Sequence, residues 1–502
     1  MKVLRTPLRR RLTLALALAA TAALVTALGA GASVPLQQIA VDTFTNPDSQ
    51  HATIVEPDTF ASGNTIVAVA QFGRFFDGGA SDIGWATSQD GGATWPSSGG
   101  LPGLTVNSVP AGPYARVSDP SVAYDAMHHV WIVSSLALDA SVNGVAVVAS
   151  RSTDATGTAW LGPVTIASIG PSQSFDKNWT VCDNTPTSSF YGSCYTQFDD
   201  FGHGNALKIY YSRNGGASWT ASRVPNVGVI GGQPVVRDNG TVVVPIDNAS
   251  ETALGYTIST NGGVKFGQAF TITNITAAND PGGIRSGPLP SAEISGDNKI
   301  YVVWEDCRFR AGCTTNDLVY VTSTNGSTWS AVQRIPIDPV SSTVDHLIPG
   351  VAVDRSTSGA NIHVGVAYYY YPNVNCNQAT CDLNAGFISS VNGGTGWSTP
   401  QQLGPTPAGT LTMKLGWLPD TSQGRMVGDY ISTSYAGGTA HPAVAFANPP
   451  PSGTCGLGLV CDQALYTTTS GLAAAGGSIT ANDQVVYNGP SLNGNSAFRR
   501  AH

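Results

Sequence analysis

One short motif recurs along the chain and constrains its fold more than any other feature. Residues 88–95 read SQDGGATW, a Ser–Asp–Gly–Trp pattern that glycine makes unsuitable for a helix. Successive copies start 64, 60, 47, 64 and 67 residues apart. A recurring period of this size indicates a repeat architecture, and strand-rich repeats of about 40 to 50 residues favour a propeller. The five later copies occupy 152–160, 212–219, 259–266, 323–329 and 390–397.

Each copy has the composition of a tight turn between strands. β-forming residues such as Ile83–Thr87 precede it. The Asp or Asn bonds nearby backbone N–H groups, glycine takes a positive φ, and Trp packs onto the sheet. We therefore expect Asp90 to serve its own turn and not catalysis.

Two further strands are expected before each copy. The first opens near a proline, as at Glu56-Pro57 and Asp119-Pro120, and the second is apolar, as at Thr65–Ala70. A seventh unit without the motif runs from Arg425 to Thr468, and Ile39–Phe44 could supply its outer strand. With 58 glycines, 31 prolines and only 11% charged residues, the sequence predicts an all-β fold. We predict a β-propeller of four-stranded antiparallel blades, with seven blades favoured over six.

The N-terminus has the pattern of an export signal. A basic region ending at Arg9–Arg11 precedes the apolar stretch Leu12–Leu28 and the small-residue site Ala30-Gly31-Ala32. The basic cluster leaves the general and the twin-arginine export routes open. We predict a signal peptide over 1–32, a propeller domain over 33–490 and a C-terminal tail over 491–502.

Removal of the signal would take away five positive charges and no acidic residue, so the net charge would fall from −8 to −13. An acidic surface argues against nucleic acid and anionic membranes as partners. No later stretch is apolar enough to span a bilayer. We expect a secreted, monomeric protein whose partner is a carbohydrate or glycoconjugate.

Eight cysteines behind an export signal indicate disulfides. Their short spacing favours pairing within each local couple, whereas the spacing and the lack of nearby histidines disfavour zinc. The predicted pairs are Cys182 with Cys194, Cys307 with Cys313, Cys376 with Cys381 and Cys455 with Cys461.

The repeated pattern S-x-[DN]-x-G-x-[TS]-W resembles the Asp-box, or BNR repeat, of the sialidase (neuraminidase) superfamily. The six copies cover most of the mature chain. The resemblance implies a β-propeller whose boxes are structural and lie on the face away from the active site. Typical members have six blades.

The face opposite the boxes should carry the start of each first strand and the end of each second strand, around the usual ligand position. Starts of first strands offer Glu56, Asp119, Asp176, His346 and Asp429. Ends of second strands offer Arg74, Asp199, Asp200, Asp247, Glu305, Asp306, Arg308 and Tyr370.

The resemblance implies three arginines that bind the substrate carboxylate, an Asp acid/base and a Tyr nucleophile activated by Glu. The family's Phe-Arg-Ile-Pro signature is absent before the first blade, and QRIP at 333–336 follows the fifth box instead. By position, the candidate substrate-binding residues are Arg74, Arg308, Arg425, Asp119 and Asp176. The candidate catalytic residues are Asp77 or Asp82 as acid, Tyr430 as nucleophile and Glu305 as its partner.

Three functions fit these residues. The first is an exported exo-α-sialidase-like glycoside hydrolase. The second is a non-catalytic propeller that binds glycans or proteins outside the cell, since a fold does not fix a function. The third is a glycosidase for another sugar that works through two carboxylates, such as Asp176 and Glu305. The Asp ring could hold Ca²⁺, but solvated turns explain it equally well, so no metal or cofactor is predicted.

Overall fold

A computed structural model describes residues 33–477, 479, 486–487 and 498. The chain divides into two units, Met1–Ala32 and Ser33–His502, and the first lies outside the described residues together with the predicted signal peptide. Most of the predicted tail, 491–502, also lies outside them. Its Phe498 is described and is buried in an apolar cluster with Val244 and Ile246. Over the described ranges, no helix is long and apolar enough to cross a membrane.

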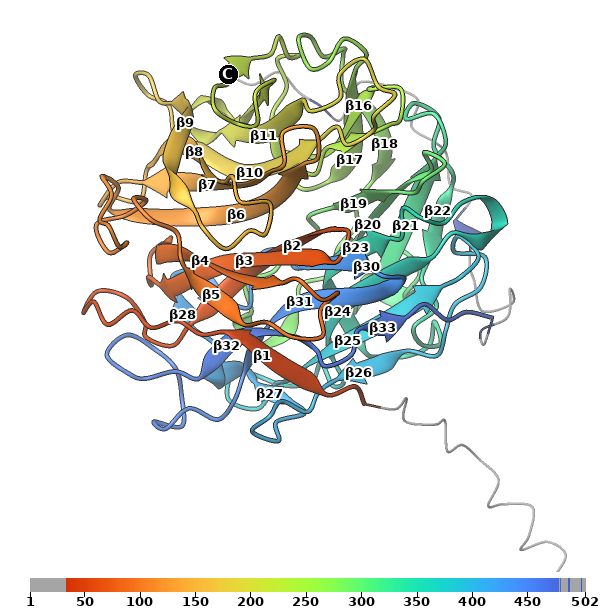
Figure 1. Ribbon diagram of the computed structural model, residues 1–502. Helices are drawn as coiled ribbons and strands as arrows, with labels where there is room; N and C mark the ends of the chain where they lie inside the picture. Colours follow the sequence, from red (N-terminus) through yellow and green to blue (C-terminus); the bar gives the residue numbers. More distant parts are fainter. Residues whose placement is uncertain (1–32, 478, 480–485, 488–497, 499–502) are drawn as a thin grey trace, which may run out of the picture. The chain divides into compact units, whose positions relative to one another are not determined.

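The second unit is all-β (Figure 1). Its described strands form antiparallel sheets of four to eight strands, apart from one two-stranded pair. Helical turns are confined to short 3-10 segments. These are η1 (Phe201–His203), η2 (Pro281–Gly283), η3 (Ala311–Cys313), η4 (Gly359–Asn361) and η5 (Leu415–Trp417).

Apart from one separate pair, the described strands fall into seven groups. Groups 1 and 2 form one eight-stranded sheet, joined where Ala80 pairs with Val117. Group 1 contains β2 (Ile54–Ser62), β3 (Thr65–Arg74), β4 (Ala80–Ser88) and β5 (Ser97–Gly100). Group 2 contains β6 (Arg116–Asp125), β7 (Val130–Leu138), β8 (Gly144–Ser152) and β9 (Leu161–Ser168). Group 3 contains β10 (Phe175–Cys182), β11 (Cys194–Asp200), β12 (Ala206–Ser212) and β13 (Thr220–Ala221).

The remaining groups repeat the same antiparallel order with small additions. Group 4 contains β14 (Val229–Gly232), β15 (Val235–Val236), β16 (Val242–Asn248), β17 (Ala253–Ser259) and β18 (Phe270–Asn274). Group 5 contains β19 (Ser291–Ile294), β20 (Ile300–Asp306), β21 (Asp317–Ser323), β22 (Val332–Arg334) and β34 (Val486–Tyr487). Group 6 contains β23 (Asp345–Val353), β24 (Val364–Tyr371), β25 (Asp382–Ser390), β26 (Gln401–Leu403) and β27 (Met413–Lys414). Group 7 contains β30 (Ser432–Ala436), β31 (Thr439–Ala447), β32 (Gln463–Thr468), β33 (Leu472–Ala473) and β1 (Leu36–Ala40).

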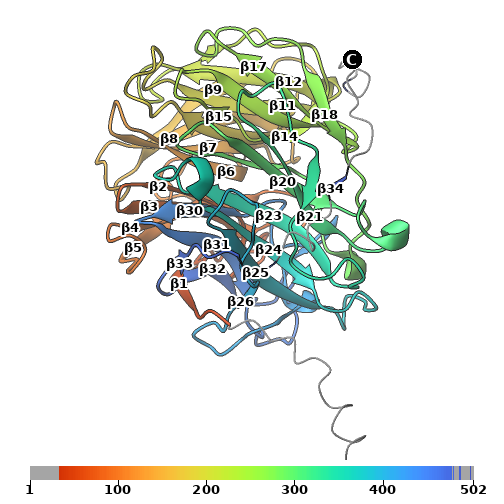
Figure 2. The same cartoon turned by 90° about the vertical axis from the view of Figure 1, so that its right-hand side faces the viewer.

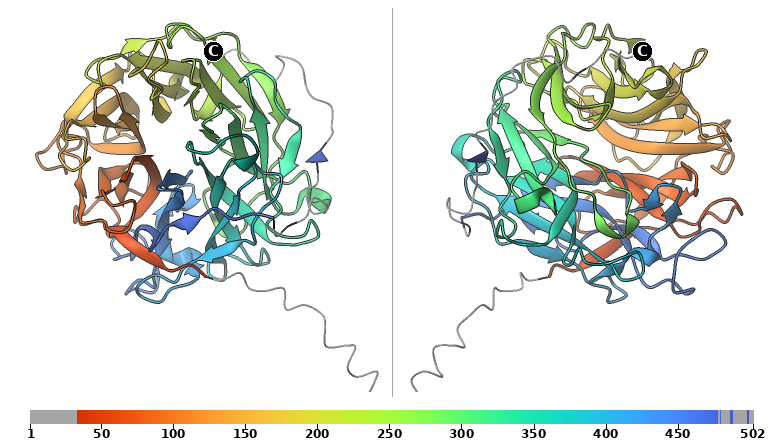
Figure 3. Two further views of the ribbon diagram at one scale, coloured as in Figure 1. Left: turned by 45° about the vertical axis from the view of Figure 1, so that its right-hand side comes forward. Right: turned by 180° about the vertical axis from the view of Figure 1, so that it is seen from behind.

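Successive groups contact each other through their first strands. Strand β2 touches β6, β6 touches β10, and β10 touches β14. The series continues from β15 to β19, from β19 to β23 and from β23 to β30. Strand β30 then touches β2, so the series returns to its start. The views in Figures 2 and 3 show these groups of the second unit following one another around a common centre.

The seventh group differs in its boundaries from the sequence-based expectation. Its first strand begins at Ser432, while Arg425 lies in the separate pair β28 (Asp420–Thr421) and β29 (Gly424–Arg425). Its outer strand is β1, which pairs with β32, so the predicted segment Ile39–Phe44 overlaps it by only two residues. Gly428-Asp429-Tyr430 lies in the connection between β29 and β30 and is not part of a strand.

The six repeated turns, 88–95 and its five later copies, have the predicted hydrogen bonds and are here named the box turns. In the first, Asp90 Oδ1 accepts the Thr94 N–H at 2.9 Å, and Ser88 Oγ accepts the Gly92 N–H at 2.9 Å. The Trp95 Nε1–H donates to Gly92 O at 3.2 Å. Each box turn joins the third strand of a group to the fourth.

The box turns also fasten each group to the preceding one. Tyr301 on β20 donates its hydroxyl to Gly393 O at 3.2 Å, in the box turn of group 6. Thr87 on β4 of group 1 donates its hydroxyl to Gly157 O at 2.8 Å, in the box turn of group 2. A Cβ at Gly92 would overlap the His441 ring of group 7. The core lies between groups in the same way, where the fully buried Trp397 packs with residues of β20 and β23.

The four disulfides are the predicted pairs. Cys182–Cys194 joins neighbouring positions on β10 and β11. The other three close the connections between the second and third strands of groups 5, 6 and 7. They are Cys307–Cys313, Cys376–Cys381 and Cys455–Cys461, and none of the described cysteines is free.

Candidate functional site

A backbone irregularity recurs near the start of the first strands. Glu56, Asp119 and Lys177 have positive φ values of 55°, 50° and 54°. At each of them the first strand slips in register against the second, as a β-bulge does. A bulge re-aims a side chain, and left-handed non-glycine residues concentrate at functional sites. Three groups thus present one charged side chain each from the same backbone position.

Lys177 meets two residues from distant parts of the chain. Its ammonium group pairs with Asp429, which precedes β30. Arg285, in the connection between β18 and β19, binds the same carboxylate with both prongs, Nε donating to Oδ1 at 2.7 Å and Nη2 to Oδ2. The side chains of Lys177 and Asp429 are only 9% and 10% exposed. Two cations and a carboxylate are therefore held together with little water.

Strand β3 links this ion cluster to Glu56 and Asp119. Arg74 Nη1 donates to Gln71 Oε1 at 2.9 Å, and Gln71 Nε2 donates to Glu56 Oε2 and to Ser118 Oγ. Ser118 in turn donates to Asp119 Oδ1 at 2.7 Å. The Lys177 N–H donates to Asp119 Oδ2 at 3.0 Å, which closes the network.

The carboxyl groups of this network titrate in opposite directions. Burial, and then the charges of Asp119 and Asp429, raise the pKa of Glu56 to about 8. Burial and the charge of Asp119 raise the pKa of Asp176 to about 6. Burial also acts to raise the pKa of Asp429, but Arg285 and Lys177 outweigh it and lower the value. Divergent pKa values of neighbouring carboxyls are a mark of acid/base assignments.

Tyr430 adjoins the network and is almost completely buried. Its hydroxyl donates to Pro120 O at 3.0 Å, and its ring meets Trp179 edge-on with centroids 5.1 Å apart. Burial raises the pKa of Tyr430, and the negative charges of Glu56 and Asp119 add to the effect. The charge of Glu56, from group 1, therefore acts on Tyr430, while the Tyr430 hydroxyl itself bonds to Pro120 O.

The structure brings four of the predicted site residues together: Arg74, Asp119, Asp176 and Tyr430. The predicted acid Asp77 lies in the connection after Arg74, with its side chain 54% exposed and paired with Arg116. Partial burial acts to raise the pKa of Asp77, but the hydrogen bond and charge of Arg116 lower it. Asp77 is thus an ionised surface group in this conformation.

The other three predicted residues bind elsewhere. Glu305 on β20 accepts the Ile348 N–H at 3.1 Å and interacts with Asp280 and Asp345. Arg308 pairs with Asp306 two residues away. Arg425 donates to Leu418 O at 2.8 Å and to Cys455 O at 2.7 Å. The functional roles predicted for Glu305, Arg308 and Arg425 are therefore not supported by contacts with Tyr430.

Sequence reasoning missed four members of the network: Gln71, Ser118, Lys177 and Arg285. Lys177 directly follows the predicted Asp176. The bulge at this position, which the sequence does not reveal, turns the Lys177 side chain toward the network. Arg285 lies in GGIRSGP at 282–288, a glycine-rich connection with no strand signal of its own. A lone cation in such a connection is the signal that could have found it.

A second cluster has the spacing of a metal site. One ligand atom each from Asp317, Asp338 and His346 lies within 4.8 Å of the others. Arg310 and Arg334 each pair with both Asp317 and Asp338 at 2.5 to 2.7 Å. Because two guanidinium groups already balance these carboxylates, the cluster is an ion-pair network that fits a cation poorly.

No protein-family model and no curated protein match the chain. Solved structures resemble its all-β fold at low identity. A Hadza microbial sialidase is 16% identical over 64% of this chain, which spans 65% of that protein, with a TM-score of 0.45. Trypanosoma rangeli sialidase in complex with sialic acid is 12% identical, with 82% of this chain and 70% of that chain covered and a TM-score of 0.46. A polysaccharide lyase, the PL25 ulvan lyase, is 10% identical, with 88% and 97% covered and a TM-score of 0.46. The chain is similar to these proteins in fold.

Proposed function

We propose that the protein is a secreted glycoside hydrolase of sialidase type, built as a seven-bladed β-propeller. The seven strand groups, with first strands in contact from β2 round to β30, support seven blades. The box turns support the predicted resemblance to Asp-box propellers. The charged network lies at the starts of first strands, the opposite end of the groups from the box turns, where the resemblance expects the active site.

The observation that carries the proposal is the meeting of Tyr430 and Glu56 with Arg74 and Arg285. The two guanidinium groups come from β3 and from the 275–290 connection, and Lys177 adds a third cation. Arginine forks suit a planar carboxylate, so an acidic sugar is the substrate class this network favours. Arg285 would exchange Asp429 for the substrate carboxylate.

In this proposal the Tyr430 hydroxyl oxygen attacks the anomeric carbon, and its proton passes to the Glu56 carboxylate. The bond from the anomeric carbon to the leaving oxygen breaks, and Asp176 supplies the proton that this oxygen takes up. Water then attacks the anomeric carbon and gives a proton to the Asp176 carboxylate, while the bond to the Tyr430 oxygen breaks and Glu56 returns the proton to that oxygen. Asp77, the acid predicted from sequence, could replace Asp176 only after separating from Arg116.

A second candidate reaction is favoured by the pKa of Glu56. A carboxyl that is protonated at neutral pH can act as general acid, with Asp176 or Asp119 as the second carboxylate, without any role for Tyr430. This is the two-carboxylate glycosidase, with Glu56 in the role that is predicted from the sequence for Glu305.

The test is hydrolysis of a fluorogenic α-sialoside by the purified mature protein. We expect Tyr430→Phe and Glu56→Gln to lower kcat/KM by about 10²–10⁴-fold. The matched controls Tyr370→Phe and Glu305→Gln should retain activity. Activity lost only in Glu56→Gln would favour the two-carboxylate reaction. A folded protein without turnover on sialosides or other acidic glycosides would leave the non-catalytic glycan-binding propeller.

A further inference from the structure

A second cavity lies at the other end of the strand groups. It has a volume of about 360 Å³ and is lined by the ends of β2, β23 and β30, together with Glu293 on β19. The neighbouring turn after β2 is tied to the first box turn, where the Gly91 N–H donates to Asn64 O at 2.9 Å. The cavity therefore opens on the box-turn side, away from the network of Glu56 and Tyr430.

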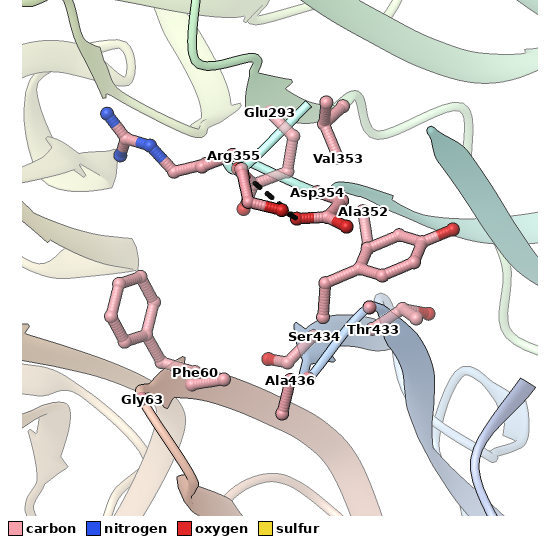
Figure 4. A pocket seen from close by; sticks show the side chains of 15 residues that line it. Phe60, Gly63, Glu293, Ala352, Val353, Asp354, Arg355, Thr433, Ser434 and Ala436 are labelled. Atoms are coloured by element: carbon pink, nitrogen blue, oxygen red, sulfur yellow. Dashed lines mark hydrogen bonds between the residues drawn. The ribbon is translucent and has the colours of Figure 1, made fainter. Parts of the chain in front are cut away.

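Two walls face each other across this cavity (Figure 4). Arg355 and Glu293 project from one wall, and Phe60 and Ser434 from the other. The Arg355 side chain has no hydrogen bond or salt bridge with any residue that the structure describes, although its charge acts on Glu293. A guanidinium group that lines a cavity and has no partner can donate two parallel hydrogen bonds to a planar anion such as a carboxylate.

The rest of the lining suits a sugar ring. Phe60 offers a half-buried aromatic surface. The hydroxyls of Ser356 and Ser434 already donate to Asp354 Oδ1 and Thr59 Oγ1, so their oxygens remain to accept hydrogen bonds from a ligand. A cavity of this size is at the lower end of the range for small-molecule sites, which fits one monosaccharide. Glycines 63, 437 and 438 line it without side chains to fill the space.

Two smaller cavities connect this one to the Tyr430 side. The first shares Phe60, Glu293 and Arg355 with the large cavity and has a volume of about 40 Å³. It shares Trp179 and Gln233 with the second, of about 30 Å³, which Tyr430 and Lys177 also line. Volumes of this size have room for a water molecule or two but not for a sugar. The large cavity is therefore a separate site and not an exit for a product.

We propose that the Arg355 cavity binds a carboxylate-bearing monosaccharide, with Arg355 holding the carboxylate and Phe60 stacking on the ring. The proposal does not depend on the reaction at the Tyr430 network. It adds a second acidic-sugar site on the opposite side of the same domain.

Glu293 gives this site a pH dependence. Burial raises the pKa of Glu293 to about 7; Arg355 opposes the rise and Asp58 on β2 adds to it. A protonated Glu293 can donate to the bound carboxylate, whereas an ionised Glu293 repels it. The affinity should therefore fall as the pH rises through about 7. Asp58, whose pKa burial also raises to about 7, acts in the same direction.

The experiment is calorimetric titration of the mature protein with D-glucuronate, glucose and inorganic phosphate at pH 6. We expect glucuronate to bind, glucose to give no heat and phosphate to bind more weakly. Arg355→Gln should lower the glucuronate association constant at least tenfold, and Phe60→Ala should lower it as well. Arg237→Gln, which removes a donor to Thr324 O, is the matched control and should change nothing.

Arg285→Lys separates this site from the Tyr430 network. Glucuronate binding that survives Arg285→Lys and is lost in Arg355→Gln supports the proposal. Binding lost in Arg285→Lys and kept in Arg355→Gln would place the ligand at the other site and overturn it, as would no glucuronate binding at all. If phosphate binds as tightly as glucuronate and Phe60→Ala leaves the glucuronate association constant unchanged, the cavity is a general oxyanion site and the sugar assignment is overturned. Glu293→Gln should retain glucuronate at pH 8, where the natural protein has lost it.

Discussion

The two ends of the strand groups use repetition in opposite ways. At the box turns the residues themselves repeat, so Ser88, Asp90 and Gly92 have counterparts in the later copies. At the bulges only the backbone repeats, and the residues with the positive φ are Glu56, Asp119, Lys177 and, in group 6, the apolar Ile348. A position whose side chain must recur serves the fold. A position that keeps its backbone but varies its side chain is available to a site.

Charge distinguishes the same two regions. The hydrogen bond from the Thr94 hydroxyl, and the other donors within its own turn, lower the pKa of Asp90 to about 2. Glu56, at a bulge, has its pKa raised by burial and by neighbouring acids. A carboxylate whose hydrogen bonds are all supplied by its own turn stays ionised and cannot transfer a proton near neutral pH. A carboxyl group that is buried with few donors can do so, because its pKa is raised.

The largest expected effect is on catalysis and depends on the pH. If Glu56 must be ionised to accept the Tyr430 proton, kcat/KM should rise with pH and level off above about 8. If Glu56 is instead the general acid, kcat/KM should fall through the same range. A pH profile of the natural protein decides between the two, and Glu56→Gln should remove the limb near pH 8. Asp90→Asn, the box-turn control, should keep the natural profile.

The next largest effect concerns Asp429. Asp429→Asn would leave Arg285 and Lys177 buried without their partner, which should lower the free energy of unfolding by about 3–5 kcal/mol. Asp77→Asn breaks an exposed pair with Arg116 and should cost less than about 1 kcal/mol. Denaturant midpoints measure both. Because the pKa of Asp429 is lowered, its stabilisation is present at neutral pH and lost as the pH falls below about 4. Equal effects of the two variants would contradict the buried ion cluster.

Two adjacent glycines sharpen the comparison at the box turns. Gly91 and Gly92 have φ values of +72° and +87°, so alanine is strained at both. A Cβ at Gly91 meets no atom within 4 Å, whereas one at Gly92 overlaps the His441 ring. We expect Gly91→Ala to cost about 1 kcal/mol and Gly92→Ala about 2–4 kcal/mol. Similar losses in thermal or denaturant unfolding would mean that the box turn does not fasten group 1 to group 7.

The smallest effect is expected at Asp90 itself. Asp90→Ala removes the acceptor for two donors of Thr94 and should cost about 1 kcal/mol, like the loss of a helix cap. Asp90→Asn should change the free energy of unfolding by less than about 0.5 kcal/mol, because Asn261 and Asn392 fill the same position in later box turns. A large loss in the Asn variant would show that the charge matters there.

The sequence predicted what depends on local chemistry. The box turns, the four disulfides and most second strands were readable because each is decided by residues close together in the chain. The second strand of group 1, for example, was expected at Thr65–Ala70 and runs over Thr65–Arg74. The position of Arg74 at its end also followed from this pattern.

The site was only half predictable, because its ion pairs join residues far apart. Arg285 and Asp429 are 144 residues apart, and neither lies in a strand. Arg308 is predicted to bind the substrate carboxylate, yet its guanidinium group forms an ion pair with Asp306, two residues away. Glu305 is predicted from the sequence to be the partner of Tyr430, whereas the charge that raises the pKa of Tyr430 includes that of Glu56. Pattern places a side chain on a face and does not choose among several partners there.

Strand β1 gives the chain an order of events. Of the described strands it is the first to be synthesised, and it pairs with β32, Gln37 lying opposite Thr467. At synthesis rates of about 5–20 residues per second, the partner strand appears on the order of a minute later. Until then the backbone N–H and C=O groups of β1 are unpaired, and another strand could pair with them. The sheet of group 7 is therefore completed only after β32 has been synthesised, and a nascent chain that stalls before residue 463 cannot close it.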